Sequence, residues 1–152
     1  MSAQKPLELA TNLLQPWAKN IENITSHHLN VMLDVVDLTA AVDALHAARW
    51  GYLGGITGSD LGLEAGLIEV LYHFFAGSAM LTLRLRIPRD KASVPSICPI
   101  ISSATFYERE LMEMMGVTVV GTPNKDRLFL PDSWPDGVYP LRKDFAGKEV
   151  NA

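Results

Sequence analysis

The residues best suited to acid–base chemistry lie in the stretch FYERELMEMMG, residues 106–116, where four charged residues interrupt an apolar run. Two carboxylates that reach one substrate atom can act as general acid and general base. Adjacent residues of an α-helix point about 100° apart, so Glu108 and Glu110 cannot share an atom if this stretch is helical. Glu110 and Glu113 are three residues apart and can face the same way. The stretch therefore offers one candidate catalytic pair, Glu110 and Glu113.

The same charges have two simpler interpretations. Arg109 and Glu113 are four residues apart, which is the spacing of an ordinary ion pair on a helix surface. The spacing alone favours the solvated side of a helix. A charged face that another protein covers is the third interpretation, and the rest of the chain has to decide among them.

The remaining residues supply no complete catalytic or metal-binding set. The four histidines lack a metal-ligand spacing such as His-Glu-x-x-His. The single cysteine, Cys98, excludes an internal disulfide and a cysteine-ligated cluster built from this chain alone. The glycine-rich stretch GYLGGITGSDLG lacks the Lys-Ser/Thr of a phosphate-binding loop. We therefore expect no catalytic, cofactor-binding or metal-binding residue on this chain.

The composition, with 48% hydrophobic and 20% charged residues among 152, is that of one globular domain. The formal net charge is −4 and no basic block occurs, so nucleic acid is a poor candidate partner. Polar residues interrupt the N-terminal apolar runs, which argues against a secretory signal. Glu69 and His73 interrupt the most apolar stretch, which argues against a membrane span. We expect a soluble, intracellular protein.

Apolar residues at helical spacing predict three helices that position these groups. The first covers residues 6–19, and the second covers 38–50 with Asp37 as N-cap and Gly51 at its end. The third begins after Ser102 or Ser103 and carries the charged stretch. Gly116 is placed to end it.

Alternating and β-branched residues predict the strands. One lies within residues 23–37, and two more lie near 66–75 and 79–87. The glycine-rich residues 51–62 predict only a short strand end and a turn. The order of elements indicates an α+β fold, with residues 1–120 forming a two-layer domain of helices packed on a mixed β-sheet.

Residues 121–152 predict an extended, irregular C-terminal tail. Four prolines break up any regular element there. Seven large apolar residues argue against a disordered tail, since a disordered segment holds few such groups. They must be buried on the domain itself or in a partner. In the isolated chain we expect this tail to be the most mobile part.

Two long motifs in the second half identify a family resemblance. The segment ERELMEMMGVTVVGTPNKDRLFLPDSW, followed by YPLRKDF, resembles the thirty-kilodalton subunit family of respiratory complex I, the NADH dehydrogenase of respiratory chains. Upstream, IEVLYHF and VPSI are also similar to that family. The matching positions are Glu108, Arg109, Glu110, Glu113, Gly116, Gly121, Pro123, Arg127, Pro131, Asp132, Trp134, Pro140, Leu141, Arg142, Lys143, Asp144 and Phe145.

The sequence departs from the family pattern at three places. Glu113 replaces the usual Asp, and Thr122 replaces the usual His. The segment WPDGVYPLRKDF is longer before Pro-Leu-Arg than is usual in complex I. In that respect it is more similar to the related subunits of membrane-bound energy-converting hydrogenases.

The resemblance implies a cofactor-free accessory subunit in the hydrophilic arm of a complex-I-like NADH:quinone oxidoreductase. NADH and quinone would be used by the assembled complex, with no iron–sulfur cluster and no flavin on this chain. The implied partners are the large hydrogenase-like subunit of the forty-nine-kilodalton type and the cluster-bearing small subunit. The implied location is the cytoplasmic side of the cell membrane, as a peripheral part of a membrane complex. The alternatives are the equivalent hydrogenase subunit and a stand-alone small enzyme that uses Glu110 and Glu113.

We expect two charged triplets to recognise the partner, one on a helix and one on the tail. Alternating signs specify orientation, because a slipped register sets like charges opposite each other. The triplets could pair with each other or with the large subunit. The expected partner-binding residues are Glu108, Arg109, Glu110, Glu113, Arg127, Asp132, Trp134, Arg142, Lys143 and Asp144.

Overall fold

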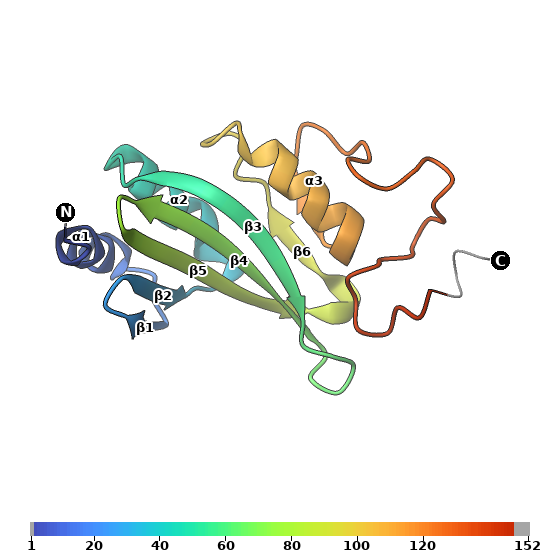
Figure 1. The fold of residues 1–152 in the computed structure, drawn as a ribbon, viewed down its shortest axis with the longest axis horizontal. Coiled ribbons are helices and arrows are strands. Elements are labelled where there is room, and N and C mark those ends of the chain that lie inside the picture. Colours follow the sequence, from blue (N-terminus) through green and yellow to red (C-terminus); the bar gives the residue numbers. More distant parts are fainter. Residues whose placement is uncertain (1, 148–152) are drawn as a thin grey trace.

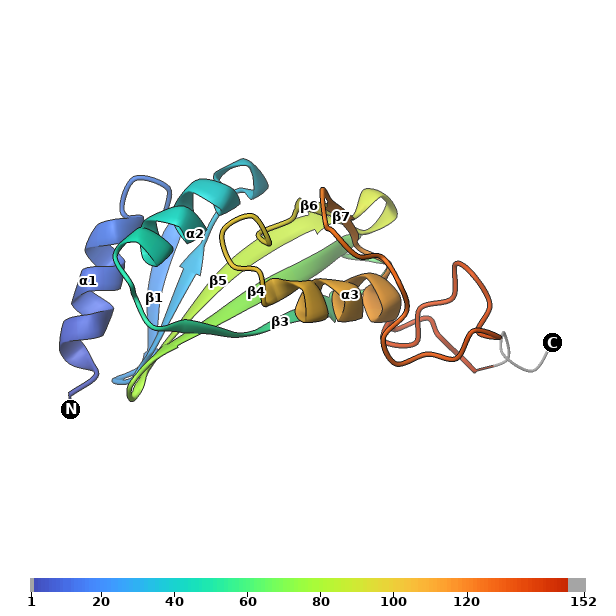
Figure 2. The same cartoon turned by 90° about the horizontal axis from the view of Figure 1, so that it is seen from above.

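The computed structural model describes residues 2–147 and has a two-layer α+β architecture, as predicted. A five-stranded sheet has the strand order β1-β2-β5-β4-β3. In Figures 1 and 2 the helices α1 and α2 lie at one end of the sheet and α3 lies toward the other, with the tail beyond it. Helix α1 and the described part of the tail therefore lie at opposite ends of the molecule.

The first two helices are shorter than predicted. Helix α1 spans Gln4–Leu14 and α2 spans Leu38–Ala47. Arg49, with a φ of 52°, takes the left-handed conformation after α2, so the helix ends before Gly51. Asp37 stands at the N-cap position of α2 but makes no side-chain capping bond. A short 3-10 helix, Val35–Asp37, precedes α2.

The sheet is mixed. Its strands are β1 (Asn20–Thr25), β2 (His28–Met32), β3 (Tyr52–Asp60), β4 (Leu67–Ala76) and β5 (Ala79–Pro88). The pair β2 and β5 is parallel, and the other neighbours are antiparallel. The two strands predicted near 66–75 and 79–87 are confirmed as β4 and β5, and the strand predicted within 23–37 as β2.

One face of this sheet forms the core. Alternate residues of a strand point to the same face. Ile68, Val70, Leu81 and Leu83 are fully buried, and they belong to one apolar cluster with residues from all three helices. The helices therefore cover the same face of the sheet.

The prediction for residues 51–62 was wrong, because β3 is a strand of nine residues. Its glycines provide close approach to neighbouring groups rather than turns. A Cβ atom at Gly58 would lie 2.6 Å from Met115 Cγ, and one at Gly54 would lie 2.3 Å from the Phe75 ring. Strand β3 is thus glycine-rich because neighbouring side chains, including those of α3, pack directly on its backbone.

The predicted third helix is α3, Ala104–Met115, and Gly116 ends it in the left-handed conformation with a φ of 69°. Two short strands, β6 (Ser93–Pro95) and β7 (Thr118–Val120), pair in parallel beside it. A second 3-10 helix, Arg89–Lys91, follows β5.

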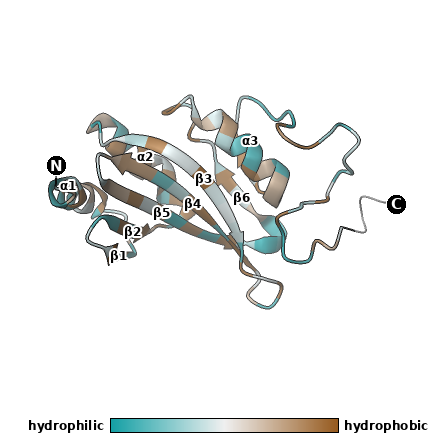
Figure 3. Ribbon diagram, viewed as in Figure 1, coloured by the Kyte–Doolittle hydropathy of each residue, from teal (hydrophilic) through white to brown (hydrophobic). Residues whose placement is uncertain are grey.

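The part of the tail that the structure describes, residues 121–147, contains no helix and no strand. Residues 148–152 of the predicted tail lie outside the described residues. Hydrophilic and hydrophobic segments alternate along the tail in Figure 3.

Candidate functional site

Glu108 points into the domain, contrary to the prediction of an exposed charged face. It is 1% exposed, and its carboxylate accepts hydrogen bonds from Ser96 Oγ at 2.7 Å and from the Ile97 main-chain N–H at 2.9 Å. The Cys98 thiol donates a third bond, at 3.1 Å. Burial, together with the nearby Glu108 carboxylate, raises the pKa of that thiol. Glu108 therefore fixes the loop before α3 to the helix.

A sequence signal for this burial exists. The buried residues of α3 are Ala104, Glu108, Leu111 and Met115. Their spacing of four, three and four residues is that of a single helix face. Glu108 therefore lies within the apolar stripe, where a carboxylate needs internal hydrogen-bond donors.

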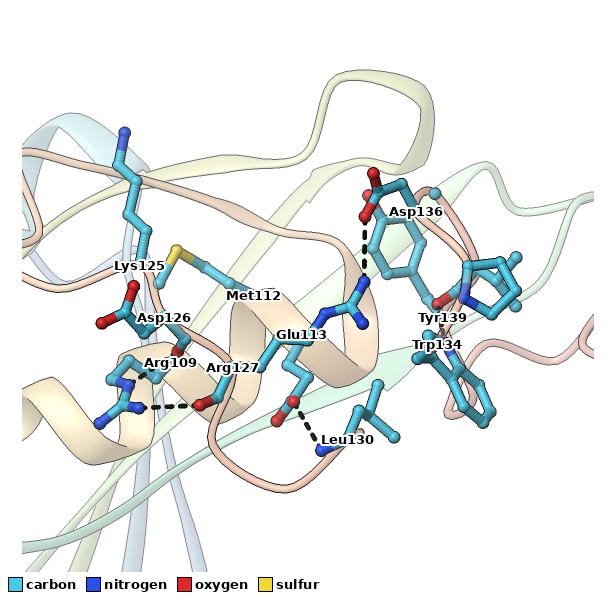
Figure 4. A pocket seen from close by; sticks show the side chains of 13 residues that line it. Arg109, Met112, Glu113, Lys125, Asp126, Arg127, Leu130, Trp134, Asp136 and Tyr139 are labelled. Atoms are coloured by element: carbon cyan, nitrogen blue, oxygen red, sulfur yellow. Dashed lines mark hydrogen bonds and ion pairs between the residues drawn. The ribbon is translucent and has the colours of Figure 1, made fainter. Parts of the chain in front are cut away.

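Arg109 and Glu113 bind the tail instead of each other. Arg109 donates from Nε to the Asp126 carbonyl at 2.9 Å and from Nη2 to the Arg127 carbonyl at 3.0 Å. The Glu113 carboxylate accepts the main-chain N–H groups of residues 128, 129 and 130, at 3.2, 3.0 and 2.7 Å. Figure 4 shows both side chains reaching from α3 to the tail. One cation and one anion on the helix thus hold consecutive carbonyl and amide groups of the tail.

Arg127 closes the next part of the tail into a loop. It donates to the carbonyl oxygens of Pro131 at 2.7 Å and Asp132 at 3.2 Å, and it pairs with the Asp136 carboxylate at 2.9 Å. The Trp134 indole N–H donates to the carbonyl of residue 138 at 2.9 Å. These bonds shape the loop from within.

A cavity of about 280 Å³ lies between this loop and α3 (Figure 4). Its walls combine apolar and charged side chains. They include Arg109, Met112, Glu113, Arg127, Leu130 and Trp134.

A second attachment joins the tail to the sheet. Arg89 binds Asp60 through Nε at 2.9 Å and through Nη2 at 3.0 Å, and the same Nη2 also pairs with Asp144 at 2.7 Å. Asp60 also accepts the Lys143 main-chain N–H at 2.9 Å. The hydrogen bond from Arg89 holds the pKa of Asp60 well below its usual range, and its partner raises the pKa of Arg89. This buried pair therefore stays ionised.

The two charged triplets do not pair with each other. In the second triplet, Arg142 Nε donates to the carbonyl of Met115 at 2.7 Å, and its guanidinium lies 4.9 Å from the Tyr139 ring centroid. Arg142 thereby satisfies a carbonyl at the C-terminal end of α3, where no intrahelical partner remains. Lys143 and Asp144 take part in the attachment to Asp60 and Arg89.

Sequence reasoning missed Asp60 and Arg89. Asp60 is the last residue of β3, which was predicted to be a turn. Arg89 comes directly after β5 and therefore lies outside the alternating pattern of that strand. No local pattern relates positions 29 and 55 residues apart. Their role becomes visible only when the fold brings them together.

Main-chain groups of the tail are bonded to the domain, while two of its large apolar side chains are exposed. Phe129 is 64% exposed and Leu141 is 58% exposed, although each stands next to a residue that is bonded to α3. The other large apolar residues of the tail are half-buried, namely Leu128, Leu130, Trp134, Tyr139 and Phe145. This is the reverse of the arrangement in the domain core.

The stand-alone enzyme hypothesis finds no support in this geometry. Glu113 lines the cavity and has three main-chain donors, whereas Glu110 does not line it. Within residues 2–147 no group of three His, Cys, Asp or Glu side chains is arranged to hold a metal ion. No helix in that part of the chain has the length and apolarity to cross a membrane.

Comparison with known proteins gives a family match. The family model described as "Respiratory-chain NADH dehydrogenase, 30 Kd subunit" matches residues 31–151. The chain is 35% identical over 123 residues to "Formate hydrogenlyase subunit 5" of Escherichia coli (strain K12), covering 79% of this chain and 22% of that protein. It is 38% identical over 90 residues to "Membrane-bound hydrogenase subunit beta" of Pyrococcus furiosus, covering 58% and 52%.

A third relative is an NADH-quinone oxidoreductase subunit from Ruegeria pomeroyi. It is 36% identical over 127 residues, covering 81% of this chain and 62% of that protein. The chain thus spans less than two thirds of the length of each of these three relatives.

Two solved structures share the fold. A chain of the membrane-bound sulfane sulfur reductase, described as an archaeal respiratory membrane complex, has a TM-score of 0.79 and 25% identity. The match covers 93% of this chain and 86% of that one. A trypsin-resistant fragment of Nqo5 has a TM-score of 0.62 and 21% identity, covering 82% and 99%, and supports the fold alone.

Proposed function

The chain belongs to the family of the 30 kDa subunit of respiratory-chain NADH dehydrogenase, and from this premise we propose that it is an accessory subunit of a complex-I-like NADH:quinone oxidoreductase. It docks on the large catalytic subunit and positions it relative to the cluster-bearing small subunit. The chain itself binds no cofactor. It reaches the membrane only through the complex, on the cytoplasmic side.

The observation that carries this proposal is the reversed arrangement of the tail. Charged groups of α3 and the sheet hold the tail's main chain, and this leaves Phe129 and Leu141 turned outward. Exposed apolar groups on a tail that the body already holds at several points suit a protein partner, because less ordering remains to oppose binding than for a free tail. The tail is therefore a preformed contact surface.

Apart from Glu108, which is buried, the charged residues of the predicted set divide into two roles within this proposal. Arg109, Glu113, Arg127, Arg142 and Asp144 act indirectly, because their bonds hold the tail in shape. Three other side chains make no ion pair within the described residues and remain available to the partner, namely Glu110, Asp132 and Lys143. Direct recognition then combines these three charges with the exposed apolar groups.

Such a role needs no chemistry on the chain. Electron transfer and quinone reduction require fixed distances between redox groups on neighbouring subunits. An accessory subunit with a rigid body and a shaped tail helps by fixing those distances.

The equivalent subunit of a membrane-bound energy-converting hydrogenase is a second candidate. The formate hydrogenlyase and membrane-bound hydrogenase relatives favour it, as does the lengthened segment before Pro-Leu-Arg. The physical role of the subunit is the same in both assemblies.

Purification of the intact complex through a tag on this chain tests the proposal. We expect a large hydrogenase-like subunit and a cluster-bearing small subunit to co-purify with it. Oxidation of NADH by the purified complex would favour the first assembly, and oxidation of hydrogen the second. Recovery of the chain alone from gently lysed cells would contradict both.

A further inference from the structure

The face of the sheet opposite the core carries a row of hydrogen-bonded side chains that the proposed function does not use. His28 on β2, Thr82 on β5, His73 on β4 and Thr57 on β3 alternate along their strands with the core residues. His28 Nε2 and His73 Nδ1 each lie 3.0 Å from Thr82 Oγ1, and His73 Nε2 lies 3.0 Å from Thr57 Oγ1. One continuous chain of contacts thus crosses four of the five strands.

The number of hydrogens at the contacts limits how many of the two imidazoles can be charged while the row stays fully hydrogen-bonded. Thr82 is 1% exposed, and its hydroxyl carries one hydrogen while two imidazole nitrogens contact its oxygen. When at least one imidazole is neutral, one nitrogen donates to Thr82 and the other accepts from it. When both are charged, each of the two nitrogens carries a hydrogen and neither can accept. The buried Thr82 hydroxyl then loses its acceptor.

Charged residues of both signs surround the row. Arg84 and Arg86 on β5 and Glu69 on β4 share this face, and both arginines bind Glu69. Glu22 lies on β1 opposite residue 30, at the exposed edge of the face, and β3 presents the uncharged residues 57 and 59.

Both histidines favour the neutral form. Burial lowers the pKa of His28, and the Arg84 charge lowers it further. Burial lowers the pKa of His73, with a further contribution from His28.

We propose that the row His28–Thr82–His73–Thr57 is a pH-sensitive connection between the β1–β2 hairpin and the rest of the sheet. It is intact while at most one imidazole is charged, and it breaks when both are protonated. Within the sheet, the hairpin pairs with the other strands only through β2 and β5, and the row adds side-chain contacts beside that pairing. The proposal does not depend on which complex the chain enters.

The direction of the pH effect follows from the lowered pKa values. A folded chain that binds these protons less readily than the unfolded chain gains stability as pH rises. The stabilisation is complete above the ordinary histidine pKa of about 6.5. It is lost as pH falls through the lowered pKa values of His28 and His73.

The test compares the melting temperatures of the wild-type chain and of Thr82→Val, which removes the hydroxyl and keeps the shape, between about pH 7.5 and about pH 4. The lower limit lies well below the ordinary histidine pKa of about 6.5, because the pKa values of both histidines are lowered. At the upper pH we expect the variant to melt lower by about 2–4 °C, the shift that losing one hydrogen-bonded link gives in a chain of this size. At the lower pH the gap should shrink to less than half, because the wild-type row is then broken as well. A gap that stays constant over this range would mean that Thr82 only fills space, and would overturn the proposal.

Two further variants serve as controls for this measurement. Thr57→Val removes only the exposed end of the row, where Thr57 Oγ1 can accept a hydrogen from His73 Nε2 in the charged form as well, so it should show a smaller gap that stays constant on acidification. His27→Gln changes an exposed neighbouring imidazole outside the row and should keep the wild-type pH dependence. A change in slope for His27→Gln equal to that for Thr82→Val would overturn the assignment to this row.

Discussion

The body and the tail of this molecule are held in place by opposite means. In the body, strands and helices bury Leu83, Val70 and similar side chains completely, and burial of apolar area dominates the stability. In the tail, residues 121–147 form no regular element, and charged side chains of the body hold its main chain. Burial of many apolar groups is cooperative, whereas each tail contact is a separate polar bond in competition with water. The body should therefore unfold as a unit, and the tail should detach piece by piece.

The largest expected effect lies at the boundary between the two regions. Arg89→Ala leaves Asp60 buried with its charge uncompensated, so we expect a loss of about 3–5 kcal/mol in the free energy of unfolding. Chemical denaturation measures this loss. Arg86→Ala is a matched control. Arg86 is half-exposed and forms an ion pair with Glu69, and in this variant Glu69 still has its ion pair with Arg84. A loss for Arg89→Ala no greater than for Arg86→Ala would show that the body does not depend on this pair.

The same attachment predicts an acid effect. The pKa of Asp60 is depressed, so its contribution to stability is present above the ordinary aspartate pKa of about 3.9 and is lost as pH falls below that value. Asp60→Asn should melt lower than wild type at neutral pH, and the two melting temperatures should converge under strong acid. Thermal melts over this acid range supply the measurement. Parallel curves for the two proteins would assign the acid effect to other carboxylates.

The next largest loss of stability is expected at Glu108, and Glu110 in the same triplet provides the contrast. Glu108→Ala strands the internal donors of Ser96, Ile97 and Cys98, so we expect a loss of roughly 2–3 kcal/mol in the free energy of unfolding. Glu110→Ala removes a side chain that makes no ion pair within the described residues, and it should change that free energy by less than about 0.5 kcal/mol. Equal effects of the two substitutions would contradict the burial of Glu108.

Arg109→Ala should have a small effect on stability and a clear effect on the tail. It removes two bonds to carbonyl groups of the tail and leaves the body's core unchanged, so the melting temperature should barely move. Hydrogen exchange at residues 126–130 should become faster, and assembly with the large subunit should weaken. The control is Glu110→Ala, which leaves those amides alone. If Arg109→Ala unfolds the lone chain, the tail is a cooperative part of the body and the contrast between the regions fails.

The wild-type chain permits a related measurement. Exchange should be faster across residues 121–147 than in β4 and β5, with slower exchange at residues 128–130, whose amides donate to Glu113. Uniform slow exchange throughout the tail would show that it packs as tightly as the body. The oligomeric state must be measured alongside, because exchange of tails between two copies would also give protection.

The sequence predicted those elements whose side chains alternate or repeat. Strands β4 and β5 and helix α3 with its closing Gly116 follow from periodicity, since their buried faces are made by their own residues. Strand β3 was missed because its glycines leave room for the Phe75 ring and for the Met115 side chain, which lie elsewhere in the sequence. A local pattern cannot encode such distant neighbours.

The candidate site shows the same distinction between features that a local pattern encodes and features that only the fold creates. The motif residues Arg109, Glu113 and Arg142 were singled out from the sequence, but their partners are main-chain groups of the tail and of α3, which no residue type reveals. Asp60 and Arg89 were missed because only the fold brings them to Asp144. The burial of Glu108 was within reach, since its position falls on the apolar stripe of its own helix.

The absence of a side chain at Gly58 sets how closely α3 packs on β3, and the tail is attached to α3. Helix α3 rests on β3 at this position, with Met115 Cγ 2.6 Å from the point that a Cβ would occupy. The same helix carries Arg109 and Glu113, and its last turn receives Arg142. One added methyl group at position 58 would therefore force the Met115 side chain, or α3 and the tail with it, to move. The size of residue 58 would then influence the tail, although the tail does not contact it through any hydrogen bond or ion pair within the described residues.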